Sequence, residues 1–295
     1  MENFELMLAY ISDQYDRHHQ LCHASNLIGK WYDGMSGKKM SDTQANALFD
    51  IISNYYEYLK ANTSLIGFEE VTVRKRVDLL NTYYNFFFEN GYDNVFPSQS
   101  KFRPTILEEF MFLLFRDYVD YLRNEYGDSE GVIGSGAAKA YTNLYFSSRN
   151  FESFVKEPSI EINLKDQDFA IYRAFQLTIN GVTKDVRIPV VSVENKTYID
   201  KTMLEGIIAT AEKIKTGNPY SLFIAVTENY DVDLKVDPAY SRIDQIYVLR
   251  KSKRKELWRD ISFDVVWRMF DSVKNHIERP WSDVEQKMRN DGVII

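Results

Sequence analysis

Apolar residues recur at helical spacing through the first third of the chain. The clearest examples are Leu6, Met7, Tyr10 and Ile11, and later Ala47, Leu48, Ile51, Ile52 and Tyr55. Because positions i, i+3, i+4 and i+7 share one face of an α-helix, this spacing predicts a helical region over residues 1–96. Another helix is predicted from Thr105 to about Asn124, since Thr105 and Glu108 have the spacing of a capping box.

The pattern changes to that of strands after residue 165. From Phe169 to Thr178 the chain is rich in aromatic and β-branched residues, and Asn180-Gly181 is the dipeptide that a type I′ turn favours. The sequence therefore predicts an antiparallel hairpin whose second strand ends in the apolar run 190–193. Because Pro189 has no N–H to donate, this returning strand should begin at an edge or a bulge there and become central only from Val190 onward.

Further elements are predicted on both sides of the hairpin. After it come a helix opening with a capping box at Thr202 to Glu205, a buried strand over Tyr220 to Val226, a strand over Ile243 to Leu249 and an amphipathic helix over Phe263 to Ile277. Before it, Gly127 to Ala138 is expected to be a mobile loop. The order of elements predicts the α/β (α+β) class, with a mixed central sheet flanked by helices and an N-terminal helical lobe. We divide the chain into a helical region, 1–96, and a second domain, 97–295.

Composition narrows the class of protein. With 295 residues and 44% hydrophobic content, the chain can bury a large core. One cysteine, Cys22, excludes a disulfide framework and a thiolate zinc site, which favours a reducing cytoplasm. We expect no signal peptide and no membrane segment, because no window approaches the roughly 18 consecutive apolar residues of a span. The net charge of −7 argues against indiscriminate binding of polyanions.

Charged side chains cluster at the two strands of the predicted hairpin. Glu194 and Lys196 follow the apolar run, and as positions i and i+2 of a strand they project to one face. The antiparallel pairing brings Asp168 back towards them. Asp166 competes for the same role, and we favour Asp168. Two carboxylates suit Mg²⁺, and a lysine beside them can orient water and stabilise negative charge, as hydrolysis of a phosphodiester requires.

Longer runs around these residues carry a resemblance to a known family. Taken alone, Glu194 and Lys196 are better explained as a solvated ion pair on an edge strand, because so short a motif is degenerate. The longer runs are TILEEF at 105–110, KDQDF at 165–169, VENKTYIDKTMLE at 193–205 and SRIDQIYVLR at 241–250. Together they resemble PD-(D/E)xK type II restriction endonucleases, and within these the subunits of heteromeric BbvCI-like enzymes.

The resemblance implies a restriction-endonuclease-like fold in the second domain and Mg²⁺-dependent cleavage of double-stranded DNA at CCTNAGC-type sites. The products would be 5′-phosphate and 3′-hydroxyl ends. Each catalytic centre would cut one strand, so the expected partners are DNA and either a second nuclease subunit or a second copy of the chain.

The resemblance also implies roles for individual residues. Asp168 and Glu194 would be ligands of Mg²⁺, together with the backbone carbonyl of Asn195. Lys196 would orient the attacking water, and Glu108 would act as an outer acid from the preceding helix. The chain departs from the family pattern twice, because Gln167 stands where a proline usually precedes the first aspartate and Asn195 stands where an apolar residue is usual.

A basic segment supplies candidates for binding DNA. From residue 241 to 259 there are seven basic residues and two acids. Lysine and arginine neutralise backbone phosphates. We therefore take as candidate DNA-binding residues Arg242, Arg250, Lys251, Lys253 and Arg254. A solvated turn is the alternative for residues 250–255, and Arg242 is better placed, at the start of a strand.

Two rival functions remain open. The chain could be a DNA-binding or assembly subunit without catalysis, which the change at Asn195 favours and the retention of Glu194 and Lys196 opposes. It could instead be a repair nuclease of the same superfamily that prefers a DNA structure over a base sequence. Cleavage at one defined duplex site would exclude the repair nuclease.

Overall fold

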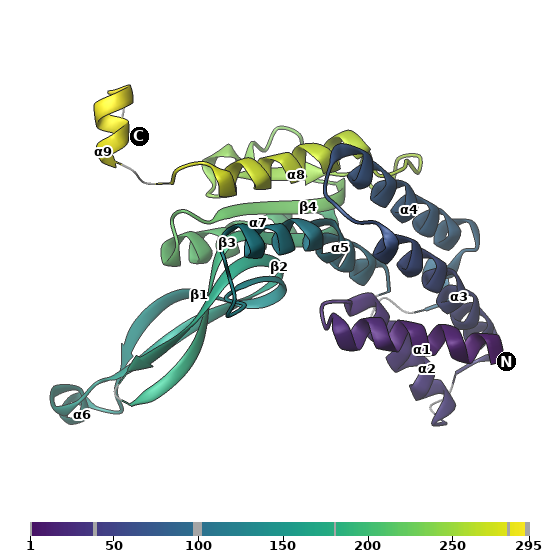
Figure 1. Cartoon of the computed structure of the whole chain (residues 1–295), viewed down its shortest axis with the longest axis horizontal. Helices are drawn as coiled ribbons and strands as arrows, with labels where there is room; N and C mark the ends of the chain where they lie inside the picture. Colours follow the sequence, from purple (N-terminus) through teal and green to yellow (C-terminus); the bar gives the residue numbers. More distant parts are fainter. Residues whose placement is uncertain (1, 38–39, 97–101, 180, 282–283, 293–295) are drawn as a thin grey trace.

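Helices make up the N-terminal region of the protein. The computed structural model describes residues 2–37, 40–96, 102–179, 181–281 and 284–292. The helices of the N-terminal region are α1 (Glu2–Arg17), α2 (Cys22–Met35), α3 (Asp42–Ser64) and α4 (Glu70–Glu89), followed by the short turn η1 (Tyr92–Asn94). Figure 1 shows them gathered at one end of the molecule, which confirms the predicted helical region.

A mixed sheet with flanking helices follows. Its elements are α5 (Phe102–Glu125), β1 (Ile133–Ser147), α6 (Phe151–Lys156), β2 (Ser159–Ile179), β3 (Val182–Ile199), α7 (Lys201–Gly217), β4 (Leu222–Tyr230), η3 (Pro238–Tyr240), β5 (Gln245–Val248), α8 (Phe263–Glu278), α9 (Val284–Gln286) and η4 (Lys287–Asp291). The strands form one sheet in the order β1-β2-β3-β4-β5. β1, β2 and β3 pair antiparallel, and β4 and β5 add to them in parallel. The predicted fold class is confirmed.

The hairpin of β2 and β3 has the expected form. Gly181 takes a left-handed φ of 76°, as the tight turn requires, while Asn180 lies outside the described residues. Ile171 pairs with Val191 and Tyr172 with Pro189, so one residue of β3 is left over as a bulge. From Val191 onward β3 also pairs with β4. The bulge at Pro189 and the central position of the strand after it are confirmed, but the strand begins at Val182 instead of at Pro189.

Three local predictions are wrong. The segment expected to be a mobile loop is a strand from Ile133 onward, since β1 pairs there with β2. The helix expected to begin at Thr105 already includes Phe102, and the Thr105 hydroxyl donates to the Phe102 carbonyl instead of capping the helix. The capping box predicted at Thr202 to Glu205 is not formed, because the N-cap of α7 is Asp200, whose side chain accepts a hydrogen bond from the backbone N–H of Met203.

The turn between α1 and α2 docks on the edge strand β1. The side-chain oxygen of Gln20 accepts a hydrogen bond of 2.9 Å from the backbone N–H of Ala137. Gly136 has a φ of 121°, and a Cβ there would lie 2.1 Å from the same oxygen. The backbone conformation therefore favours glycine, and a larger residue would also displace the Gln20 side chain from this contact.

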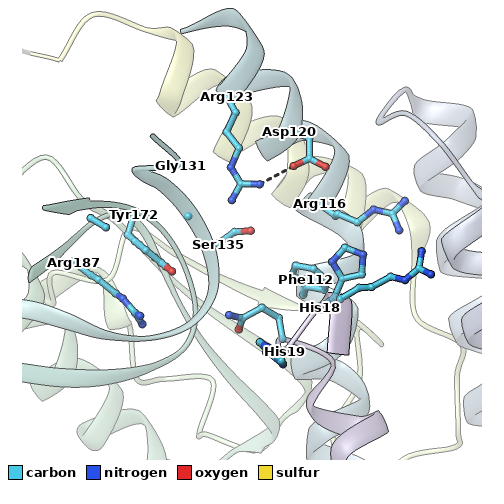
Figure 2. Close-up of a pocket in the computed structure, with 14 residues that line it drawn as sticks. His18, His19, Phe112, Arg116, Asp120, Arg123, Gly131, Ser135, Tyr172 and Arg187 are labelled. Atoms are coloured by element: carbon cyan, nitrogen blue, oxygen red, sulfur yellow. Dashed lines mark hydrogen bonds and ion pairs between the residues drawn. The ribbon is translucent and has the colours of Figure 1, made fainter. Parts of the chain in front are cut away.

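A cleft of about 460 Å³ lies beside this contact. Figure 2 shows it between Arg123 and Asp120 of α5 and Tyr172 and Arg187 of the hairpin. Arg123 pairs with Asp120 at 2.8 Å, and the Arg187 guanidinium lies 5.2 Å from the Tyr172 ring centre. Four arginines and one acid line the cleft, but Arg17, Arg116 and Arg123 each pair with an aspartate, so most of the positive charge is compensated.

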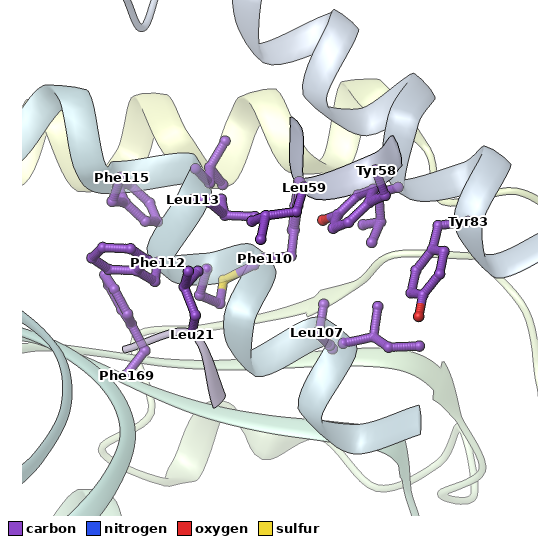
Figure 3. Packing of buried hydrophobic residues seen from close by; sticks show 14 of the residues in the cluster. Leu21, Tyr58, Leu59, Tyr83, Leu107, Phe110, Phe112, Leu113, Phe115 and Phe169 are labelled. Atoms are coloured by element: carbon purple, nitrogen blue, oxygen red, sulfur yellow. The ribbon is translucent and has the colours of Figure 1, made fainter. Parts of the chain in front are cut away.

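One hydrophobic core joins the helical region to the sheet, with α5 at its centre. Figure 3 shows Phe115 of α5 near Phe169 of the sheet, with Tyr58 and Tyr83 of α3 and α4 at the other end of the helix. The ring centres of Phe115 and Phe169 are 5.5 Å apart. A second core beneath α7 includes Leu204 and covers the opposite face of the sheet. The core continues across the boundary proposed at residue 96, and the division into two domains stays a prediction.

A buried polar network fixes α2 on α5. The Glu109 carboxylate accepts hydrogen bonds from the backbone N–H groups of His23 (2.8 Å) and Ala24 (3.0 Å) and from the Tyr55 hydroxyl (2.7 Å). Burial raises the pKa of Glu109 to about 7. Burial also lowers the pKa of His23 to about 3, and the His23 ring contacts the Tyr83 hydroxyl at 2.9 Å.

The free energy of unfolding is expected to depend on the protonation of Glu109. Its pKa is raised in the folded protein, so the stabilisation is full below the unfolded pKa and is lost as pH rises through about 7. In Glu109→Gln this dependence disappears. Urea denaturation measures the unfolding free energy of both proteins at pH 4.5 and at pH 8. Between these two values, wild type should lose about 3 kcal/mol more stability than Glu109→Gln. His23 titrates in both proteins, and an unchanged difference would contradict the assignment.

Candidate active site

The candidate residues lie where β2 and β3 separate. Pairing between the two strands ends at Phe169 and Val193. Beyond that pair, β2 continues beside β1 while β3 continues beside β4. Asp168 directly precedes Phe169 in β2, and Glu194 directly follows Val193 in β3, so both lie just beyond the last pair. The sheet therefore forks at the predicted site, and the two carboxylates stand on opposite branches of the fork.

The Asp168 carboxylate bridges the two branches. Its Oδ2 accepts hydrogen bonds from the backbone N–H of Asn195 at 2.7 Å and from Lys196 Nζ at 3.3 Å. The first bond takes the place of the backbone pairing that ends at the fork. Gly136 pairs with Ala170 and Ala138 with Gln167, so two residues of β2, one of them Asp168, oppose a single residue of β1. Such a bulge redirects a side chain, here towards β3.

The amine of Lys196 contacts three oxygen atoms of the site. Its Nζ donates to Glu194 Oε1 and to the Asn195 carbonyl, both at 2.9 Å, in addition to Asp168. The side chains of Lys196 and Glu194 are 29% and 15% exposed. Burial acts to lower the pKa of Lys196, but the carboxylates of Asp168 and Glu194 outweigh it, so the pKa is raised. The amine is therefore a cation at neutral pH and suits charge stabilisation rather than proton abstraction.

The structure distinguishes the two candidate aspartates. Asp166 is exposed and pairs in register with Lys139 of β1, whereas Asp168 contacts Lys196. Asn195 is 5% exposed, as expected for a side chain that points away from its neighbours Glu194 and Lys196. Neither polar atom of its amide has a partner among the described residues. Its backbone carbonyl faces the site, as the predicted ligand role requires.

Glu108 lies on α5, and its Oε2 is 3.9 Å from Cys22 Sγ at the start of α2. Val193 packs in the same core as α5. Because side chains alternate along a strand, Glu194 and Lys196 project to the face of the sheet opposite α5 and Glu108. The role of Glu108 as an outer acid stays a prediction.

The oxygen atoms of the site suit a hard cation. The Lys196 ammonium is surrounded by two carboxylates and one backbone carbonyl, from Asp168, Glu194 and Asn195. Carboxylate and carbonyl oxygens are ligands that Mg²⁺ accepts, with waters completing its coordination. Within the described ranges, no group of three His, Cys, Asp or Glu side chains could hold a metal. A magnesium ion here would therefore depend on these two carboxylates, the carbonyl and water.

The prediction that Arg250 binds DNA is wrong. Arg250 is 2% exposed, and its Nε lies 2.8 Å from Glu228 Oε2. Its guanidinium also stacks 3.7 Å from the centre of the Trp258 ring. A group enclosed in this way cannot reach a phosphate. Arg242 is exposed and pairs with Glu212 at 3.1 Å on the surface.

The remaining basic candidates lie in one exposed loop, and one of them reaches a neighbour of the site. Lys251, Lys253 and Arg254 are exposed in the loop after β5. The Arg254 guanidinium is 4.0 Å from the centre of the Tyr198 ring. Tyr198 follows Lys196 by two positions, so the two side chains share a face of β3. Tyr198 was not among the predicted residues, although its spacing from Lys196 was a usable signal.

A buried ionic network supports the strand beside the site. Glu228 of β4 is fully buried and pairs with Arg103 at 2.9 Å and with Arg250 at 2.8 Å. Burial acts to raise the pKa of Glu228, but the two arginines outweigh it and the pKa is lowered. Thr227, the preceding residue, pairs in register with Lys196. The network thus ties α5 and the loop after β5 to the strand that flanks the site.

Comparisons with known proteins agree with this geometry. Residues 99–278, more than half of the chain, match the sequence profile of the family described as Bpu10I restriction endonuclease. The solved structure described as the native BbvCI A2B2 tetramer at low resolution is similar in fold. It has a TM-score of 0.68 and 19% sequence identity, over 88% of this chain and 96% of that chain.

Two further findings bound the identity of the chain. A search of curated proteins found no match. No helix in the described part of the chain is long and apolar enough to cross a membrane. The family match and the shared fold confirm the predicted resemblance to type II restriction endonucleases, and in particular to BbvCI subunits. The chain belongs to the Bpu10I restriction endonuclease family.

Proposed function

We propose that this protein is a catalytic subunit of a type II restriction enzyme and hydrolyses double-stranded DNA with Mg²⁺. The observation that carries this proposal is the contact of Lys196 Nζ with the carboxylates of both Asp168 and Glu194 at the fork of the sheet. Two acids and a partly buried cation, brought together from different strands, are what metal-dependent phosphodiester hydrolysis requires. The family match supports a nuclease.

Each residue of the site has a distinct task in this mechanism. Asp168, Glu194 and the carbonyl of Asn195 would hold Mg²⁺. An ion held by these residues would supply polarisation of the phosphoryl group and a lower pKa for a coordinated water. Lys196, kept protonated by the acids around it, donates a hydrogen bond to the attacking oxygen and stabilises the negative charge that develops on the phosphate. The attacking water would lose a proton to solvent and form a bond to phosphorus while the bond to the 3′ oxygen breaks, and the departing 3′ oxygen would take a proton from solvent, which leaves 5′-phosphate and 3′-hydroxyl ends.

Exposed basic residues would position the DNA. Arg254 stacks on Tyr198, next to the candidate lysine, and Lys251 and Lys253 lie in the same exposed loop. Such side chains contact backbone phosphates and fix the register of the duplex without reading its sequence. Arg242 is exposed and retains surplus donors beyond its pair with Glu212. We include it among the phosphate contacts.

A second subunit is part of the proposal. One catalytic centre cuts one strand, so cleavage of a duplex needs two centres. The similar solved structure is a tetramer of two kinds of chain. The partner would be a second nuclease subunit, or a second copy of this chain, and the enzyme would act in the cytoplasm.

One observation favours a different function. The Asn195 amide is buried without a hydrogen-bond partner among the described residues, at a position where the resembled family has an apolar residue. An unsatisfied buried amide costs about 1–3 kcal/mol. A polar residue at the middle of the Glu194-Asn195-Lys196 motif would be tolerated in a DNA-binding or assembly subunit that has lost catalysis.

Cleavage of plasmid DNA tests the proposal. The purified chain, alone and with its co-encoded partner subunit, should nick or cut at discrete sites when Mg²⁺ is present. Glu194→Gln is expected to slow this reaction by about 100-fold, because the amide keeps one oxygen ligand but loses the charge. Glu205→Gln, an exposed glutamate on α7, is the matched control and should cleave normally.

The other outcomes separate the rival functions. Sequence-specific binding without cleavage under every partner condition would assign the chain to a non-catalytic subunit. Cleavage of branched or mismatched DNA with no preference for a duplex sequence would assign it to repair.

A further inference from the structure

Beyond the fork, β1 and β2 first pack against α7, where Ala140 lies in the second core, and then continue alone as a two-stranded ribbon. We define the ribbon as residues 143–165, which include α6 at its far end. Here β2 pairs with β1 but no longer with β3. Figure 1 shows the ribbon projecting from the body of the protein, away from the helices, with α6 at its tip. A two-stranded ribbon in water is marginally stable unless something packs on it.

One face of the ribbon is apolar. Leu144 pairs with Ile162 and Phe146 with Ile160, and alternate residues of a strand share a face. Leu164 continues the same face of β2. Leu144, Phe146 and Leu164 are 45%, 66% and 43% exposed. The opposite face carries Asn143, Tyr145, Glu161 and Asn163. The ribbon therefore has the alternation of a strand pair with one buried side, but its apolar side is open.

The helix at the tip repeats this feature. Phe151, Phe154 and Val155 stand at positions i, i+3 and i+4 and so form one stripe on α6. They are 80%, 50% and 66% exposed. A stripe of this kind normally faces a core. On α6 it faces solvent, at the point of the protein furthest along the ribbon (Figure 1).

The balance of charges on the ribbon favours a protein rather than DNA as its partner. Residues 144–165 contain three basic and three acidic residues, which are Arg149, Lys156, Lys165, Glu152, Glu157 and Glu161. A surface that binds DNA carries an excess of positive charge. A balanced set of charges around an apolar face is instead complementary to a second surface of the same composition.

The exposed area is sufficient for a stable contact. The six exposed apolar side chains on the apolar face of the ribbon and on α6 present on the order of 600 Å² in total, since a large apolar side chain buries roughly 150–250 Å². A standard interface buries about 800 Å² per partner, of which a little over half is apolar. The ribbon alone approaches this requirement.

We propose that the ribbon packs against the ribbon of a second copy of this chain, apolar face to apolar face about a two-fold axis. Two-fold contacts use the same patch on both subunits, which suits a face whose charges balance. The two ribbons would stack as a small four-stranded sandwich, about 10 Å apart. The inference does not depend on the proposed catalytic role.

Sedimentation equilibrium of the full chain without any other subunit tests this contact. At about 10 μM the wild-type protein is expected to have twice the chain mass of 34.6 kDa. Phe146→Asp/Phe154→Asp places charges in both parts of the apolar surface and should raise the dimer Kd at least about 100-fold. The single variant Phe151→Asp, at an 80% exposed position, should weaken the dimer without disturbing the fold.

Matched controls make the result decisive. Ile66→Asp and Leu257→Asp change side chains that are 86% and 85% exposed outside the ribbon, and both variants should remain dimeric. Circular dichroism establishes that each variant is folded. A wild-type chain that is monomeric at this concentration, or a dimer that survives the ribbon substitutions, overturns the proposal. Assembly that occurs only with a co-encoded subunit also overturns it, because the occupant would then be a different chain.

Discussion

Replacing Lys196 with methionine is expected to lower kcat for DNA cleavage by about 1,000-fold. Methionine keeps the length of the side chain but removes the cation that contacts Glu194 and Asp168 at 2.9 and 3.3 Å. The amine acts on charge that develops in the transition state, so KM should change little. Single-turnover cleavage of a plasmid or a duplex oligonucleotide measures the rate of the chemical step directly.

Lys213→Met is the matched control, since Lys213 is an exposed lysine on α7. It should cleave at the wild-type rate. DNA binding measured by fluorescence anisotropy should be similar for all three proteins, because Lys196 lies between acids and the exposed basic loop remains intact. A Lys196→Met protein that cleaves within about threefold of wild type would remove the lysine from the mechanism.

The sequence was sufficient to bring Asp168, Glu194 and Lys196 together. Alternation along a strand and a turn dipeptide are local signals, and they fixed the face and the direction of both strands. The fork could not be predicted, because it depends on β1, which pairs with β2 from outside the hairpin. β1 looked like a loop because of its glycines. A Cβ at Gly134 would lie 2.5 Å from the Tyr172 ring, so the glycine serves a contact that only the fold creates.

Arg250 shows a second limit of sequence patterns. It stands beside Lys251 and Lys253 in one basic run, yet it is buried while they are exposed. The difference arises from Glu228, which is 22 positions earlier in the chain. A run of basic residues predicts an exposed segment only when no buried acid pairs with one of them. The sequence does not show which acids will be buried.

Replacing Glu228 with glutamine is expected to lower the free energy of unfolding by about 3–5 kcal/mol. The carboxylate is fully buried between Arg103 and Arg250, so its loss leaves the enclosed Arg250 guanidinium without a counterion. Glu212→Gln is the control, because its pair with Arg242 is roughly half exposed and should contribute about 1 kcal/mol or less. Urea denaturation followed by circular dichroism at pH 7 compares the two variants.

The pH dependence gives an independent check on the same network. The pKa of Glu228 is lowered in the folded protein, so its stabilisation is present above the unfolded pKa and is lost as pH falls through the folded pKa. The gap between wild type and Glu228→Gln should therefore narrow under acid conditions. Removing the stranded cation as well, in Glu228→Gln/Arg250→Met, should cost less than the sum of the single changes. If Glu228→Gln is as mild as Glu212→Gln, water reaches the arginines and the network does not hold β4 beside the site.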